Sequence, residues 1–271
     1  MPVRIGMSTA SYFNRMPIEE TVGDIGAHGV PLCELFLNTF SEYEPAFVDR
    51  LADRLAGAGV TAYSVHPMST QFEPQLFSLH PRQRADALRI YERVLQAARR
   101  LGARCYVMHG AATLAGAAKN LQMERIAPIF AELNDMAAGY GVTLALENVS
   151  WCVFASPAFG RELRERTGDA MHFTLDVKQA VRSGYAPAAY LEAVGDRLVN
   201  VHLCDYAARE DGGYVWRMPG QGACDFAALA QALRAHGYAG PAFVEVYSDM
   251  YRELDALFES RAFCEAQMGL A

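Results

Sequence analysis

Short apolar runs alternate with longer amphipathic segments along nearly the whole chain. The short runs predict strands at 3–8, 32–37, 60–65, 104–108, 143–146, 172–175, 198–203 and 242–246. The longer segments repeat apolar residues at every third or fourth position, which is the spacing of one helix face. They predict helices at 46–58, 82–101, 121–140, 226–236 and 254–268, with weaker helical patterns around Asp24 and Ser156. Strand and helix therefore alternate along the chain.

Glycines separate several predicted helices from the strands that follow them. Gly59, Gly102, Gly141 and Gly240 occupy such positions, and glycine commonly ends a helix because it adopts the left-handed conformation without strain. Regular alternation predicts a parallel sheet, and eight units predict an α/β fold closed into a single (β/α)8 TIM barrel domain over residues 1–271. The alternative is an open doubly wound sheet, which would be expected to carry a G-x-G-x-x-G turn after its first strand. The first turn is GMSTAS, which lacks that pattern.

Composition narrows the class of partner. Of the 271 residues, 52% are hydrophobic, which is ample for a large core. The formal net charge is −7, and the 24 basic residues are scattered among 31 acidic ones without forming a basic run. Such a chain is poorly suited to neutralise a series of phosphates, so we expect no nucleic-acid partner.

Cysteine usage and the N-terminal segment predict the compartment. The six cysteines lie far apart and form no C-x-x-C pair, which favours reduced thiols in an intracellular protein. The first residues, MPVRIGMSTASYF, lack the apolar run of a signal peptide, and no window approaches ~18 uninterrupted apolar residues. We therefore expect a cytoplasmic protein with no membrane partner.

Ionisable side chains stand near the ends of the last six predicted strands. They are His66, His109, Glu147, Asp176, His202 with Asp205, and Glu245. In a TIM barrel these strand ends converge on the face that carries the active site. Each residue taken alone is equally well explained as a cap or turn residue that bonds a backbone N–H. The set as a whole favours a shared site.

Three of these residues, Glu147, Asp176 and Glu245, are carboxylates. If they converged, they would repel one another and raise each other's pKa unless a cation lay among them. Together with His202 they therefore predict a site for a divalent metal ion. Oxygen-rich ligation with one imidazole suits Mn²⁺, Mg²⁺ or Co²⁺. Mn²⁺ is our first choice, and Zn²⁺ stays open as an alternative.

Several short motifs near the strand ends resemble those of a known family. They are LALEN, TLD, NVHLCD, FVEV and the segment PGQGACDF before the predicted helix at 226–236. This set is similar to that of the xylose isomerase-like TIM barrels, the superfamily of sugar phosphate isomerases and epimerases. Its members include ketose 3-epimerases, inosose dehydratase and the nuclease that cuts DNA at abasic sites. The resemblance runs over nearly the whole chain.

The resemblance implies that Glu147, Asp176, His202 and Glu245 are metal ligands. It also implies that Glu147 and Glu245 are catalytic, one removing a proton from the carbon next to a sugar carbonyl and the other returning it. A metal ion bound to the carbonyl and the adjacent hydroxyl would stabilise the resulting enediolate. The expected activity is a metal-dependent isomerase or epimerase of a sugar, sugar phosphate or cyclitol. The alternative is a lyase, either a dehydratase or an enzyme that eliminates an aglycone from a keto-sugar, which begins with the same proton abstraction.

The chain departs from the family pattern after Asp176. Family members often carry a histidine three residues later, where this chain has Gln179 beside Lys178. Lys178 has three possible interpretations. It is a solvated loop residue, a cation that holds an anionic or hydroxyl-rich substrate, or an amine of lowered pKa that donates or accepts a proton. Gln179 and Lys178 at these positions slightly favour substrates other than the ordinary ketohexoses.

The abasic-site endonuclease is a remote alternative within the family. Its trinuclear zinc site uses histidines at the ends of the third and fourth strands, where this chain has His66 and His109. It also requires a histidine at the position of Gln179 and an Asp-x-His before the G-x-G turn, where residues 214–216 are Tyr-Val-Trp. The missing ligands and the acidic composition disfavour this activity.

Further residues are candidates for contact with a small carbohydrate substrate. They are His66, His109, Lys178, Gln179, Asp205, Trp151, Trp216, Arg217 and Glu34. The two tryptophans follow ligand-bearing strands, where they would offer an apolar wall to a sugar ring. For Glu34 a bond to a neighbouring barrel residue is the alternative, and for Arg217 a solvated loop position. A homodimer or a homotetramer stays open.

Overall fold

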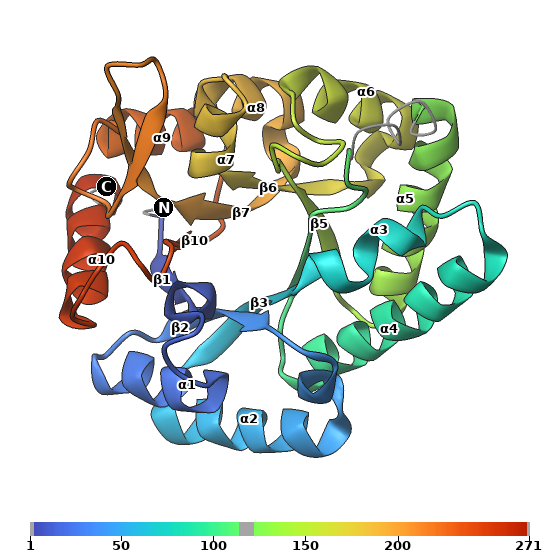
Figure 1. Cartoon of the computed structure of the whole chain (residues 1–271), viewed down its shortest axis with the longest axis horizontal. Helices are drawn as coiled ribbons and strands as arrows, with labels where there is room; N and C mark the ends of the chain where they lie inside the picture. Colours follow the sequence, from blue (N-terminus) through green and yellow to red (C-terminus); the bar gives the residue numbers. More distant parts are fainter. Residues whose placement is uncertain (1–2, 114–121, 270–271) are drawn as a thin grey trace.

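Eight parallel strands close into a barrel in the order β1-β10-β7-β6-β5-β4-β3-β2 (Figure 1). The computed structural model describes residues 3–113 and 122–269. The barrel strands are β1 (Ile5–Ser8), β2 (Leu32–Leu37), β3 (Thr61–Pro67), β4 (Cys105–Met108), β5 (Thr143–Glu147), β6 (His172–Asp176), β7 (Leu198–Leu203) and β10 (Ala242–Val244). The fold is the TIM barrel that the strand and helix pattern predicts.

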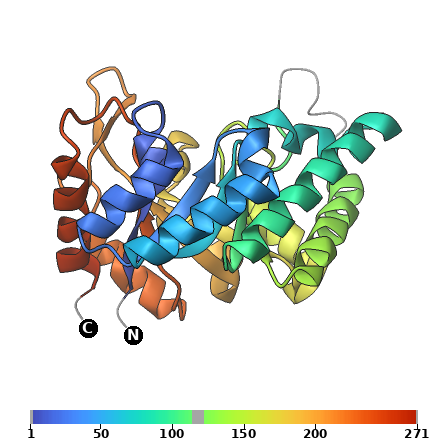
Figure 2. The same ribbon diagram turned by 90° about the horizontal axis from the view of Figure 1, so that it is seen from below.

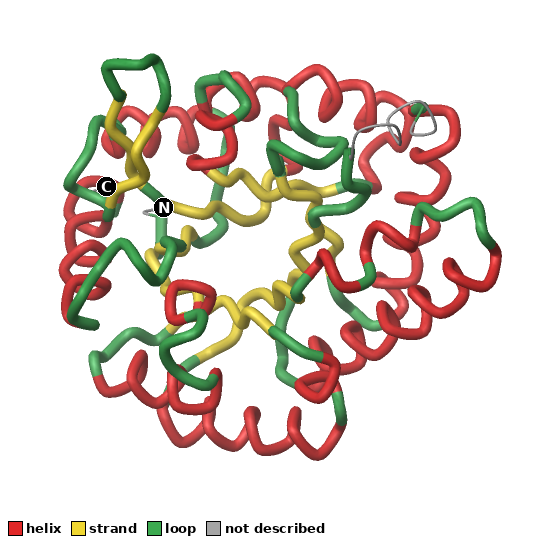
Figure 3. The backbone as a smooth tube through the Cα atoms, viewed as in Figure 1, coloured by secondary structure: helices red, strands yellow, loops and turns green. Residues whose placement is uncertain are grey.

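Helices form an outer layer around the ring of strands, as Figure 3 shows. They are α1 (Ile18–Ala27), α2 (Pro45–Ala58), α3 (Glu73–Leu76), α4 (Pro81–Arg100), α5 (Met123–Gly139), α6 (Pro157–Thr167), α7 (Val177–Arg182), α8 (Pro187–Val194), α9 (Phe226–Ala235) and α10 (Asp255–Met268). Short 3-10 turns lie at Thr9–Tyr12, Phe40–Tyr43, Ser69–Gln71, Gly168–Ala170 and Gly195–Arg197. Helix α2 buries Val48, Leu51 and Leu55, whose spacing is that of a single helix face.

Local capping explains where several helices begin and end. The Ser156 hydroxyl accepts a hydrogen bond from the Phe159 N–H, and Pro157 starts α6. The Asp225 carboxylate caps α9 in the same way, by accepting from the Ala228 N–H. Helix α2 ends at Gly59, whose φ of 67° is the left-handed conformation that glycine adopts most readily. These sequence signals determine where the helices begin and end.

The eight predicted strands are the eight barrel strands, with small shifts at their ends. Strand β5 extends to Glu147 and β6 to Asp176, whereas β10 ends one residue before Glu245. The long predicted helices are α2, α4, α5, α9 and α10, and the two weaker patterns are α1 and α6. The first residue of the predicted helix 121–140 lies outside the described residues. Helices α3, α7 and α8 were not predicted, because each is too short for apolar residues to repeat over several turns.

The pairing between neighbouring barrel strands is irregular at two places. The β2–β3 register shifts beside Cys33 and Glu34, and the β6–β7 register shifts beside Phe173 and Thr174.

Aromatic rings fill part of the barrel interior. The hydroxyl of Tyr63 in β3 donates to the Val199 carbonyl of β7 at 2.8 Å. The Phe243 ring packs beside Tyr63 with ring centres 5.9 Å apart. A Cβ at Gly6 would lie 2.6 Å from Phe243 Cε1, so glycine is required there.

A two-stranded hairpin stands on the rim of the barrel and was not predicted. Its strands are β8 (Asp205–Ala208) and β9 (Tyr214–Arg217), and they pair antiparallel. In Figure 2 this orange hairpin rises on the side opposite the two chain ends, which is the side where the barrel strands end. Most of its residues are partly or fully exposed, so the sequence lacks the apolar alternation that identifies a strand.

Two further features concern the composition. All six cysteines carry free thiols, and all but Cys224 are buried. Within residues 3–113 and 122–269, no helix combines the length and the apolar character that crossing a membrane requires.

Candidate metal-binding and catalytic site

A cavity of about 530 Å³ opens at the carboxyl ends of the barrel strands. Its polar lining includes His66, Ser69, Thr70, His109, Glu147, Lys178, Gln179, Glu245, Ser248 and Asp249, and its apolar lining includes Ala10, Phe13, Phe36, Met68, Trp151, Val246 and Tyr247. A concave site of this size with a few convergent polar groups suits a small-molecule ligand. Four of the strand-end residues of the sequence analysis, His66, His109, Glu147 and Glu245, therefore line one cavity.

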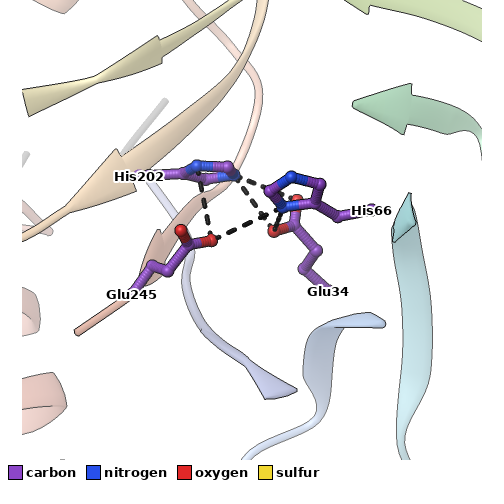
Figure 4. Close-up of side chains that lie close together, drawn as sticks. All are labelled: Glu34, His66, His202 and Glu245. Carbon is purple, nitrogen blue, oxygen red and sulfur yellow. Dashed lines mark hydrogen bonds and ion pairs between the residues drawn. The ribbon is translucent and has the colours of Figure 1, made fainter. Parts of the chain in front are cut away.

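Two histidines and two glutamates approach one another, and two of the four, His66 and Glu245, line this cavity (Figure 4). His202 Nδ1 lies 3.4 Å from Glu245 Oε2, and His66 Nδ1 lies 3.8 Å from the same oxygen. Glu34 Oε1 is 3.1 Å from His202 Nε2 and 3.5 Å from His66 Nδ1. All four side chains are buried or nearly so. Their donor atoms could share one metal ion.

His202 Nδ1 is surrounded by carboxylates. Besides Glu245, it faces Glu147 Oε1 at 3.4 Å and Asp176 Oδ2 at 3.8 Å. This nitrogen is fully buried and makes no hydrogen bond to any residue within 3–113 or 122–269. A buried nitrogen without a hydrogen-bond partner, aimed at three carboxylates, fits a centre that holds a divalent cation. The other three predicted ligands therefore face His202, an arrangement that could hold a metal ion.

The charges of this cluster shift the pKa values of its members. Burial by itself lowers the pKa of His202, but the Glu245, Glu34 and Glu147 carboxylates raise it well above its ordinary value. Burial raises the pKa of Glu147, yet His109 and His202 hold it well below its ordinary value. The glutamate is therefore ionised at neutral pH. A proton on His202 Nδ1 and a metal ion at the same atom are alternatives, because each neutralises the same carboxylates.

Glu34 lies at the floor of the site and is fully buried. Its Oε2 accepts hydrogen bonds from the Ser64 hydroxyl at 2.7 Å and the Asn200 amide at 2.9 Å, and it lies 3.1 Å from His202 Nε2. A carboxylate at Nε2 keeps that nitrogen protonated and leaves Nδ1 as the free lone pair. The sequence analysis expects Glu34 to contact substrate. The structure places it behind His202, and it does not line the cavity.

His66, His109 and Glu147 form a second group of potential ligands beside the first. His109 Nε2 lies 2.9 Å from His66 Nε2 and 3.0 Å from Glu147 Oε2. The Ser69 hydroxyl bonds His109 Nδ1 at 2.6 Å, and Glu73 accepts from the backbone N–H groups of residues 109 and 110. Both histidines line the cavity, which is the position expected of residues that contact substrate.

Lys178 is not a loop residue, and in this respect the sequence interpretation is wrong. It lies in the first turn of α7, is 3% exposed, and places Nζ 3.8 Å from Asp176 Oδ2 and 4.3 Å from the centre of the Tyr247 ring. Burial lowers its pKa, but the Asp176 and Glu245 carboxylates raise it above its ordinary value. The raised pKa favours the interpretation as a buried cation over that as an amine of lowered pKa.

Gln179 connects α7 to the loop after β5. Its backbone N–H donates to Asp176 Oδ1 at 2.7 Å, and its side-chain oxygen accepts from the Ser150 N–H and hydroxyl. Asn148 bonds the backbone of Asp176 from the other side, at 2.7 and 2.9 Å. Asp176 is therefore held in place from two elements. Lys178 and Gln179 both line the cavity, within reach of a substrate.

Three predicted substrate contacts lie away from this cluster. The two oxygens of Asp205 accept hydrogen bonds from four backbone N–H groups, those of residues 206, 220, 222 and 224. Asp205 thereby organises the turn that contains PGQG. Trp216 and Arg217 lie in β9 and line a neighbouring cavity of about 430 Å³. The structure brings neither of them against the histidine and carboxylate cluster.

The sequence profile described as xylose isomerase-like TIM barrel matches residues 20–267. The match spans most of the barrel and all four predicted metal ligands. The chain belongs to the xylose isomerase-like TIM barrel family.

Several proteins are similar to this family member. An uncharacterized protein of Mycobacterium leprae is 23% identical over 279 residues, which cover 92% of this chain and 91% of the relative. Among solved structures, D-psicose 3-epimerase from Clostridium cellulolyticum H10 has a TM-score of 0.77 at 16% identity, with 97% of this chain and 98% of that chain covered. An E. coli 3-keto-D-glucoside 4-epimerase has a TM-score of 0.76 at 18% identity, with 97% and 99% covered. The IolI protein with a bound zinc atom has a TM-score of 0.79 at 18% identity, with 97% and 96% covered. At these identities the structures share the fold.

Some residues that build the site of this family member were not singled out in its sequence. Ser69 and Glu73 follow β3 in a 3-10 turn and a short helix, where no periodic signal marks them. Asn200 precedes His202 by two positions in β7, so alternation along the strand does place it on the same side. Tyr247 has the same relation to Glu245 and lines the cavity. Strand alternation would therefore have found Asn200, whereas Tyr247 lies beyond the end of β10.

Proposed function

We propose that this protein is a divalent-metal-dependent isomerase or epimerase. Its substrate is a sugar, sugar phosphate or cyclitol, and the reaction begins by removal of a proton next to a carbonyl group. One observation carries the proposal. Glu147 and Glu245 both line the cavity, and both place an oxygen 3.4 Å from the same nitrogen of His202. Two candidate bases therefore face the same nitrogen of a candidate metal ligand.

The two glutamates come from separate parts of the barrel. Glu147 ends β5, Glu245 follows β10, and strands β6 and β7 lie between them in the barrel order. Burial raises the pKa of Glu245, but His202, His66 and Lys178 lower it, so this carboxylate is ionised at neutral pH like that of Glu147. Two carboxylates that approach a substrate from different strands suit proton removal by one of them in its ionised form and proton return by the other after it has taken up a proton from solvent.

The remaining groups position the substrate and its charge. Glu147, Asp176, His202 and Glu245 would hold a divalent cation, which would stabilise the negative charge that forms on the substrate's carbonyl oxygen. Lys178 adds a buried positive charge that attracts an electron-rich substrate. Trp151 offers a flat apolar surface in the cavity wall, on which a sugar ring can stack.

The similar structures support the same class of reaction. Those described above include epimerases of D-psicose and of a 3-keto-D-glucoside. A zinc atom is bound in the IolI protein, which supports a divalent metal without identifying it for this chain. We do not propose the nuclease activity, because no observation of the site favours it over a carbohydrate substrate and the chain has a net charge of −7.

The test is exchange of a carbon-bound substrate proton with solvent. Purified protein loaded with Mn²⁺ is incubated in D₂O with a panel of keto-sugars and inososes, and the loss of C–H signals is followed by NMR. We expect exchange that requires the metal and that Glu147→Gln and Glu245→Gln each reduce by at least about a hundredfold, a typical contribution of one general base. Glu192→Gln, an exposed position in α8, serves as the control with unchanged exchange.

The same measurement separates the two reaction types. An epimerase or isomerase produces a labelled isomer, whereas a lyase releases water or an aglycone together with label in recovered substrate. If exchange proceeds equally well after removal of the metal, or in both glutamate variants, the proposed chemistry is wrong.

A further inference from the structure

A second cavity of about 430 Å³ lies beside the metal-site cavity. It is lined by Arg209, Tyr214, Val215, Trp216, Arg217, Met218, Gln221, Tyr247, Asp249 and Met250. Most of these residues belong to the β8–β9 hairpin and the turn after it, and the rest to the segment that follows β10. The hairpin therefore forms one wall of a site outside the strand-end cluster.

The two cavities meet at Tyr247. Tyr247 and Asp249 line both of them. The ammonium of Lys178, which lines the metal-site cavity, lies 4.3 Å from the centre of the Tyr247 ring. Only one residue layer therefore separates a sugar bound near Glu245 from a group in the second cavity. A ligand longer than one sugar ring can occupy both.

The second cavity presents aromatic faces. Tyr214 and Trp216 are stacked, with ring centres 6.3 Å apart and planes inclined by 23°. Tyr214 and Tyr247 are 42% and 41% exposed, although large aromatic side chains are usually covered. A flat ring inserted among these three side chains would cover apolar surface and form aromatic contacts. This lining favours an aromatic ligand over a second sugar with a polar face.

One guanidinium in this cavity is free to bind an anion. Arg209 pairs with Asp211 at 2.8 Å. Arg217 is exposed and forms no ion pair with any residue in the described part of the chain, 3–113 and 122–269. Asp249 disfavours negative charge on its own side of the cavity. An acidic substituent is therefore expected at Arg217, since arginine binds carboxylates in a bidentate geometry.

We propose that the second cavity binds an aromatic aglycone that carries an acidic group, joined to the sugar that occupies the metal-site cavity. The substrate is then a glycoside of an acidic phenol, oxidised to a ketone on the sugar ring. This inference rests on the proposed function for the sugar end of the ligand. The aromatic subsite itself is a binding site and can be measured without catalysis.

The two tryptophans of the chain make the two cavities separately observable. Trp151 lines the metal-site cavity and Trp216 the second cavity. In the Trp151→Phe variant all tryptophan emission comes from Trp216. We expect 4-carboxyphenyl β-D-glucopyranoside to change this emission saturably, and methyl β-D-glucopyranoside at equal concentration to leave it unchanged. The two probes share the sugar and differ only in the aglycone.

Calorimetric titration then tests the residues of the subsite. We expect Arg217→Gln and Trp216→Leu each to weaken binding of the carboxyphenyl probe by about tenfold, the loss expected for one charged hydrogen bond or one stacked ring. Arg182→Gln, at an exposed position in α7, is the matched control and should bind like the wild type.

The outcomes separate this inference from the proposed function. The aromatic subsite is wrong if the aryl and methyl glucosides bind with equal affinity, or if Trp216 emission does not change when the aryl probe is added. Either result stands even if proton exchange is observed. Aryl binding that depends on Arg217 and Trp216 supports the subsite even if no exchange occurs, and the reaction alone is then wrong.

Discussion

The Glu34 carboxylate lies 3.1 Å from Nε2 of His202 and is itself held by Ser64 and Asn200. This relationship fixes the orientation of the one imidazole in the predicted ligand set. It also directs Nδ1 of His202 toward Glu147, Asp176 and Glu245. A residue that does not line the cavity thus determines which nitrogen is offered to a metal ion.

Glu34→Gln tests this arrangement. Glutamine is uncharged and has one acceptor oxygen in place of two, so it holds the proton on His202 Nε2 less strongly and the imidazole loses its fixed orientation. We expect Mn²⁺ affinity to fall 10- to 100-fold, the usual loss when a partner of a metal-binding histidine is removed, while the circular dichroism spectrum stays that of the wild type. Calorimetric titration with Mn²⁺ measures the affinity. Unchanged affinity would show that His202 is oriented by other contacts.

His202→Ala and Glu147→Gln test the ligands themselves. Wild-type protein should bind about one divalent cation per chain, and each variant should lose tight binding because a donor atom is removed from the centre. Elemental analysis after dialysis against a metal buffer measures the stoichiometry. His80→Ala, an exposed histidine at the start of α4, is the control and should retain the metal. A wild-type chain that binds no divalent cation contradicts the site.

Lys178→Met removes the buried ammonium beside Asp176 and Tyr247. If the ammonium attracts the substrate, kcat/KM should fall by roughly tenfold or more, as for loss of one charged hydrogen bond. Metal affinity should stay equal or increase, because the variant no longer places a positive charge near the metal ligands. Proton-exchange rates and metal titration measure the two effects. Arg182→Met in the same helix is the control, and a variant with wild-type kinetics removes Lys178 from the substrate site.

Asp205→Asn tests a structural role for a residue expected to contact substrate. Asparagine can accept hydrogen bonds at one atom only, whereas both oxygens of Asp205 accept from backbone N–H groups of the turn at 218–224. We expect the free energy of unfolding to decrease by about 3 kcal/mol. Urea denaturation measures it. Asp211→Asn, whose side chain is exposed, should cost under about 1 kcal/mol, and equal effects in the two variants would contradict the role.

Cys264 gives a pH-dependent contribution to stability. Burial raises its pKa above the ordinary value of 9.0, helped by Cys224 and Asp205. Above pH 9.0 the unfolded chain loses this thiol proton while the folded chain keeps it, so stability falls as pH rises. The difference in unfolding free energy between wild type and Cys264→Ala should be constant below about pH 8 and should shift steadily against the wild type from pH 9 to pH 10.5. Urea titrations at four pH values measure it. A difference that does not change with pH would mean that the Cys264 thiol has the same pKa in the folded and the unfolded chain.

The sequence by itself determined the barrel fold and the end of the barrel at which the candidate ligands lie. Apolar runs, helical periodicity and glycine stops are local properties, so each element could be found from its own residues. Parallel strands in a closed barrel end on one face, and that rule predicts that Glu147, Asp176, His202 and Glu245 lie near one another; in the structure the other three all face His202.

Tertiary structure decided how those residues are used. The charge of Lys178 depends on Asp176 and Glu245, and no feature within α7 shows whether the amine is buried. Asp205 bonds amide groups up to nineteen positions away. The second cavity arises where the hairpin and the segment after β10, separated along the chain, come together at Tyr247. Orientation, burial and charge coupling depend on neighbours from other strands, and a one-dimensional pattern does not contain them.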